Sequence, residues 1–124
     1  MQDYRKLIAW QRAHGMTLAV HQVFGRRPRG GVPGLSAQIL RSAAATAANI
    51  AEGCGHRTPG ELARYLDIAV ASVVELDYHL LLARDLGVIA DGQYNVLARE
   101  ARDVRQLLSA LARRVRMPDE RCES

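Results

Sequence analysis

The sequence predicts an all-α fold, an antiparallel up-down-up-down four-helix bundle that forms one domain over residues 1–124. Alanine and leucine dominate the composition, with 19 and 15 copies, while aromatic residues make up only 5%. That balance favours helices over sheets. Four segments repeat apolar residues at steps of three and four, which is the period of an amphipathic helix. Mostly short loops join them, as expected for antiparallel neighbours.

The first helix is predicted over residues 4–24. A loop rich in glycine, proline and arginine follows at residues 25–34, and this composition breaks a helix. The apolar stripe that predicts the helix consists of Ala9, Ala13, Met16, Val20 and Val23.

The second helix is predicted over residues 35–52. Its centre, Ser42–Ala48, contains almost only small residues, so neighbouring helices can approach it closely. We therefore expect this helix in the most crowded part of the core. Gly53 and Gly55 are predicted to end it.

The third helix is predicted over residues 59–86, with Thr58 and Glu61 as a capping-box pair and Pro59 at the first helical position. Gly87 follows its last residue. Its stripe keeps strict spacing through Leu62, Leu66, Ala69, Val73, Leu76, Leu80 and Ala83.

The fourth helix is predicted over residues 92–116, with Asp91 as its cap and a polar tail at residues 117–124. Its apolar residues again alternate steps of three and four. They are Tyr94, Leu97, Ala101, Val104, Leu108, Leu111 and Val115.

The charge of the chain is positive and uneven. The formal net charge is +4, and 16 of the 17 basic residues are arginines, which suit phosphate and carboxylate partners. Residues 1–57 carry +6, residues 58–98 carry −4 and residues 99–124 carry +2. Two interpretations remain open: acidic and basic helices that pair within or between subunits, or a face that binds a polyanion.

Arginines gather at three places that could contact phosphate groups. They lie in the first loop, in the glycine-rich segment before the third helix and at the end of the fourth helix. Because no aromatic residue lies among these arginines, we expect contacts to the nucleic-acid backbone rather than base stacking. The candidates are Arg26, Arg27, Arg29, Arg57, Arg113, Arg114 and Arg116.

No pattern in the sequence predicts catalysis, a metal site or a cofactor. Histidine and carboxylate spacings match no metal motif, and neither a phosphate-loop nor a nucleophile motif occurs. Cys54 and Cys122 are expected to be free thiols of a reducing compartment. With no apolar run of membrane-spanning length and no secretory signal at the start, we expect a cytoplasmic protein that is not an enzyme.

The third predicted helix has more apolar surface than one core seam needs. A flanking line either broadens the core stripe or packs against another subunit. We expect a homo-oligomer that uses this line, which consists of Tyr65, Ile68, Leu82 and Leu86.

Four segments of the chain resemble a known family. They are Leu7–His14, Gly34–Arg41, Asn49–Gly53 and Glu61–Glu75. Together they are similar to small bacterial four-helix-bundle proteins. That family includes proteins encoded in intervening sequences of 23S ribosomal RNA genes and accessory proteins of diversity-generating retroelements.

The resemblance implies a cytosolic homopentamer without catalysis, some of whose relatives bind RNA or DNA and a reverse transcriptase. It also implies a structural role for Asn49, Ile50, Ala51, Glu52 and Gly53. Because Glu52 lies near a helix C-terminus, where negative charge is disfavoured, we expect an arginine beside it. Two functions follow as alternatives: a nucleic-acid-binding accessory module, or a protein-interaction scaffold that binds no nucleic acid.

Overall fold

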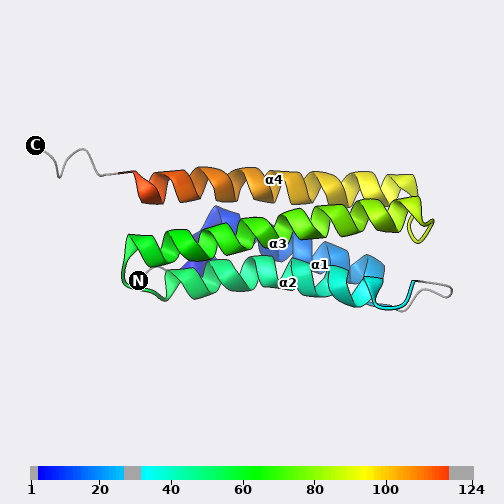
Figure 1. The fold of residues 1–124 in the computed structure, drawn as a ribbon, viewed down its shortest axis with the longest axis horizontal. Helices are drawn as coiled ribbons and strands as arrows, with labels where there is room; N and C mark the ends of the chain where they lie inside the picture. The colour runs from blue at the N-terminus through cyan, green and yellow to red at the C-terminus, as the bar shows by residue number, and fades with distance from the viewer. Residues whose placement is uncertain (1–2, 27–31, 118–124) are drawn as a thin grey trace, which may run out of the picture.

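The computed structural model describes residues 3–26 and 32–117, and these residues form helices and no strand (Figure 1). The all-α fold is therefore confirmed for this part of the chain. No helix within it is long and apolar enough to cross a membrane. The elements are the short 3-10 helix η1 (Tyr4–Lys6) and the α-helices α1 (Ile8–Phe24), α2 (Leu35–Cys54), α3 (Pro59–Asp85) and α4 (Asp91–Arg116).

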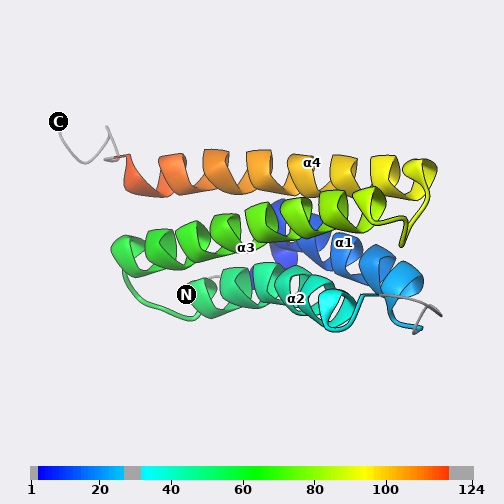
Figure 2. The same ribbon diagram turned by 45° about the vertical axis from the view of Figure 1, so that its right-hand side comes forward.

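The four α-helices lie side by side, and each runs antiparallel to the next along the chain (Figures 1 and 2). α2 contacts α1 and α3, while α4 contacts α3 and α1, so the helices close a ring around one core. The beginning of α3 consequently lies at the same end of the bundle as the last turn of α4. The end of α1 and the beginning of α2 lie at the opposite end.

Small residues bring α1 and α2 close together in the core. Ala43 on α2 is fully buried, and its carbonyl oxygen accepts a hydrogen bond from Thr17 Oγ1 on α1 at 3.1 Å. Thr46 is also fully buried and donates its hydroxyl hydrogen to the Ser42 carbonyl. The crowded centre predicted for the second helix is thus present on its inner face, whereas Ala44 and Ala48 on the other face are exposed.

The first predicted helix is in fact interrupted at Leu7. Leu7 has an extended backbone (φ −78°, ψ 128°) that separates η1 from α1. Asp3 accepts a hydrogen bond from the Arg5 amide and caps η1. The interruption lets Tyr4 pack edge-on against Trp10, with ring centroids 5.0 Å apart, and His14 stacks on the same indole ring at 4.8 Å.

Two predicted helix ends need correction. α2 continues through Gly53 to Cys54, because Gly53 is a buried helical residue in contact with α3 rather than a terminator. Asp91 is the first residue of α4 and not its cap. The amide of Ala90 donates to Gln93 Oε1 instead, and the Asp91 carboxylate lies at the positive end of the helix dipole.

The ends of α3 agree with their prediction. Thr58 Oγ1 accepts a hydrogen bond from the Glu61 amide at 3.2 Å, and Pro59 is the first helical residue. A full capping box would also have the Glu61 side chain accept from the Thr58 amide. Glu61 Oε2 instead lies 3.5 Å from Arg64 Nη2. Gly87 has φ +74°, which ends α3 in a conformation that glycine adopts without strain. Of the predicted polar tail, only Met117 falls within the described residues.

Candidate nucleic-acid interface

The structure separates the predicted arginine clusters by the length of the bundle. Arg26 follows α1 at one end, while Arg27 and Arg29 lie outside the described residues. The other four candidates meet at the opposite end, where α3 begins and α4 finishes (Figure 1). Because α3 has 27 residues, about 40 Å separates the two ends at ~1.5 Å per residue. The four that meet are Arg57, Arg113, Arg114 and Arg116.

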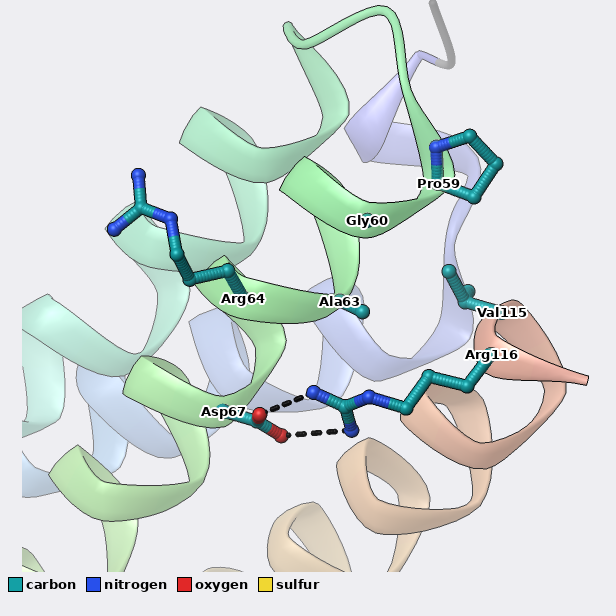
Figure 3. A pocket seen from close by; sticks show the side chains of 7 residues that line it. All are labelled: Pro59, Gly60, Ala63, Arg64, Asp67, Val115 and Arg116. Atoms are coloured by element: carbon teal, nitrogen blue, oxygen red, sulfur yellow. Dashed lines mark hydrogen bonds and ion pairs between the residues drawn. The ribbon is translucent and has the colours of Figure 1, made fainter.

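A cleft of about 360 Å³ marks the junction between α3 and α4 at this end. Arg116 reaches across it and donates two hydrogen bonds to the Asp67 carboxylate (Figure 3). These bonds raise the pKa of the Arg116 guanidinium. Arg64 points away from Arg116 in the same view and covers the ring of Tyr65 at 4.7 Å. Arg116 is therefore already occupied by an internal partner.

Arg57, Arg113 and Arg114 differ from Arg116 in this respect. All three are exposed, and none has a carboxylate oxygen within 4 Å in the part of the chain that the structure describes. The positive charge available at this end thus comes from the α2–α3 loop and from the last turns of α4.

A second cavity of about 270 Å³ lies beneath the α2–α3 loop. Arg57 and Val115 both line it, which places the loop against the end of α4. Cys54 also lines it and is buried, and this burial raises the pKa of its thiol. One backbone amide that could bind a phosphate at the start of α3 is already used, because the Glu61 amide donates to Thr58 Oγ1.

His56 lies between two carboxylates in the same loop. Its Nε2 is 3.9 Å from Glu52 Oε1, and its Nδ1 is 3.9 Å from Glu61 Oε2. Its ring also stacks on Tyr65 at 4.9 Å. The expected arginine beside Glu52 is therefore a wrong prediction for the described residues: the basic neighbour is His56, which follows Glu52 by one helical turn.

Three residues of the segment Asn49–Gly53 make contacts within the fold in the last turns of α2. Asn49 Nδ2 donates to the Ala45 carbonyl at 2.8 Å, and Ile50 is fully buried. A Cβ on Gly53 would lie 2.9 Å from Tyr65 Cβ, which is too close. Gly53 therefore sets the distance between α2 and α3.

No three His, Cys, Asp or Glu side chains approach closely enough to hold a metal ion within residues 3–26 and 32–117. Glu75 and His79, one turn apart on α3, are 4.0 Å apart. The Nδ1 atom of His79 is buried and has no hydrogen-bond partner among residues 3–26 and 32–117.

The structure divides the four predicted interface residues. Ile68 and Leu86 are 37% and 51% exposed, whereas Tyr65 and Leu82 are half-buried against their own subunit. Val74 and Tyr78 on α3 are more exposed than Ile68, at 47% and 58%. Sequence reasoning missed this pair because it followed only the line beside the core stripe.

Sequence reasoning also missed three exposed arginines on α4. None of them has a carboxylate within 4 Å among the described residues. Their spacing along the outer face was the signal that could have found them. They are Arg99, Arg102 and Arg105.

The fold and the site together define a small helical bundle with exposed arginines at one end and along its last helix. A family model described as "23S rRNA-intervening sequence protein" matches residues 5–110, so the chain belongs to this family. The match covers most of the chain, as the resemblance predicted.

A solved structure supports the fold. It is a protein of unknown function from the S23 ribosomal protein family of Bacteroides thetaiotaomicron VPI-5482, with a TM-score of 0.78 and 21% sequence identity. The similarity covers 85% of this chain and 98% of the other. A comparison with curated proteins gives no match.

Proposed function

We propose that this protein binds the sugar–phosphate backbone of RNA or DNA and performs no catalysis. The observation that carries the proposal is that Arg57, Arg113 and Arg114 lie at the same end of the bundle, exposed and without a carboxylate partner among the described residues. Guanidinium groups match the geometry of phosphate oxygens and can contact them with two parallel hydrogen bonds.

Nearby carboxylates do not cancel this charge completely, because other basic groups already face them. Asp67 is bound by Arg116, and Glu61 lies beside Arg64. The ring of Tyr65, at the α2–α3 junction, is covered by Arg64 and His56. Base stacking has no free platform there, so the proposed contact is to the backbone and tolerates any sequence.

The proposal includes a cytoplasmic homopentamer as the working form. The exposed apolar side chains of Ile68 and Leu86 support contact between subunits. In a ring of five copies, the end of the bundle that carries Arg57, Arg113 and Arg114, which we call the arginine end, would occur five times. Linked weak sites reach an affinity that a single site lacks, because each later contact is intramolecular.

The test is a titration of fluorescently labelled RNA and DNA at several salt concentrations. The logarithm of the affinity should fall linearly with the logarithm of salt, by about 0.9 per duplex phosphate contacted. Arg113→Glu and Arg114→Glu should each weaken binding and flatten this slope. The charge-matched control is Arg41→Glu, an exposed arginine on α2. Equal binding by all three variants and the parent protein would contradict the proposal.

A protein-interaction scaffold is the second candidate function. The exposure of Val74 and Tyr78 on α3 favours it, since large exposed apolar side chains are typical of protein contacts. This function predicts no nucleic-acid binding at physiological salt together with a stable oligomer in light scattering. The same titration therefore separates the two candidates.

A further inference from the structure

The outer face of α4 carries a continuous row of exposed polar side chains, which we name the donor row. Its members follow one another at steps of four, three, four, three and four, so they lie on one face of the helix. Every member can donate a hydrogen bond and none is acidic. The donor row consists of Asn95, Arg99, Arg102, Gln106, Ser109 and Arg113.

The carboxylates in the middle of α4 lie beside α1 instead. Asp103 Oδ2 is 3.0 Å from Arg12 Nη2, and Glu100 Oε2 is 3.9 Å from the same nitrogen. Arg12 belongs to α1, so its single positive charge offsets part of the negative charge of these two groups on the side of α4 that faces that helix. No carboxylate oxygen of the described residues lies within 4 Å of an arginine of the donor row, and the acidic side chain on the same face, Asp91, lies one turn before the row at the start of α4.

The helix dipole explains only part of this arrangement. It favours cations in the last turn of a helix, where Arg113 lies. Arg99 and Arg102 lie near the middle of α4, where the dipole has little effect, and Arg105 flanks them. None of these three has a carboxylate within 4 Å in residues 3–26 and 32–117. Their guanidinium groups are therefore free to bind an external anion.

We propose that the donor row binds the phosphodiester backbone of double-stranded nucleic acid along the length of α4. This inference rests on the proposed function and extends the contact from the arginine end onto the side of the bundle, with Arg113 common to both. Arginine, asparagine, glutamine and serine side chains are the usual donors to phosphate and sugar oxygens. No carboxylate in the row repels the phosphates.

The length and stiffness of the row indicate a duplex. Its ends are 18 residues apart, about 27 Å at ~1.5 Å per residue. Each strand of duplex DNA carries one phosphate per ~3.4 Å of helix axis, so the row is as long as about eight base pairs. The row contains no aromatic side chain, so it lacks the stacking platform on which single-strand binders hold successive bases.

The test compares Arg102→Glu with Arg41→Glu, which changes the net charge equally from an exposed position on α2. The probe is a labelled 12-base-pair DNA duplex, followed by fluorescence anisotropy at several salt concentrations. We expect Arg102→Glu to lower the salt slope by about 0.9, and a double Arg99→Glu, Arg102→Glu variant by about 1.8, against no change for Arg41→Glu. Circular dichroism confirms that each variant keeps its helices.

Binding measurements with other probes identify which kind of polyanion the row prefers. A duplex RNA of the same length should bind through the same residues, whereas a single strand, phosphatidylglycerol vesicles and polyglutamate should bind more weakly. Tighter binding to any of these three overturns the duplex assignment. If the parent protein binds duplex but Arg102→Glu matches Arg41→Glu, the donor row is wrong and the proposed function stands. If the parent binds no nucleic acid, both are wrong.

Discussion

Gly53 on α2 lies against Tyr65 on α3 so closely that a Cβ on Gly53 would be 2.9 Å from Tyr65 Cβ. The same Cβ would lie 3.0 Å from Leu62 Cδ1. Gly53→Ala should therefore destabilise the protein by about 1–3 kcal/mol through overpacking, although alanine alone would favour the helix by ~1 kcal/mol. Urea unfolding followed by circular dichroism measures the change.

Gly15 provides the matched control, because it lies within α1 and a Cβ there would meet nothing within 4 Å. Gly15→Ala should raise the free energy of unfolding by up to ~1 kcal/mol. Equal effects of the two substitutions would show that Gly53 does not set the distance between α2 and α3.

Ile68→Glu tests the proposed contact between subunits. Ile68 is exposed, so the substitution should leave the helices intact while it places a charge in an apolar contact. We expect a smaller particle in sedimentation and light scattering. Ile8→Glu, at a more exposed position on α1, should not change the particle size. An unchanged oligomer in Ile68→Glu would remove this line of α3 from the interface.

The Cys54 thiol should react slowly in the folded protein. Burial raises its pKa, so less of the reactive thiolate is present at pH 8, and access is blocked as well. In a Cys122→Ser variant, reaction with Ellman's reagent should be slow until urea unfolds the chain. Since the unfolded thiol ionises first as pH rises, the free energy of unfolding should also fall above about pH 8.5. Rapid reaction of the folded protein in buffer would show that the Cys54 thiol is accessible and would contradict this prediction.

Arg12 should affect nucleic-acid binding without belonging to the donor row. Arg12→Gln leaves Glu100 and Asp103 uncompensated. The substitution removes one positive charge, which at ~8 Å in water attracts a phosphate by about 0.5 kcal/mol, so the affinity should fall roughly twofold. Binding of a DNA duplex at low salt measures this loss. A triple variant that adds Glu100→Gln and Asp103→Asn should restore affinity, and Arg41→Gln controls for the lost charge.

The helices could be predicted from the sequence because their signals are local. Apolar spacing located all four, and the Thr58 cap and Gly87 marked the ends of α3. Two errors concern local caps, at Leu7 and at Asp91. The error at Gly53 involves a tertiary contact: α3 leaves room for no residue larger than glycine, and no local pattern reveals that contact.

The candidate site was predictable only in part. The sequence identified arginine-rich segments, and the predicted up-down-up-down order already implies that Arg57 lies at the end of the bundle with Arg113 while Arg26 lies at the other, as the helix bounds and directions show. That separation depends on helix direction. The pairing of Arg116 with Asp67 depends on a contact across 49 residues of sequence. The donor row, in contrast, could have been found from its spacing alone.

The ring contacts around Trp10 give the molecule a built-in optical reporter. Trp10 is the only tryptophan of the chain, and its indole is held between Tyr4 and His14. Its emission therefore monitors a single corner of the fold, where the first turn of the chain folds back onto α1. A shift in the wavelength of that emission would register the release of this turn before the rest of the bundle unfolds.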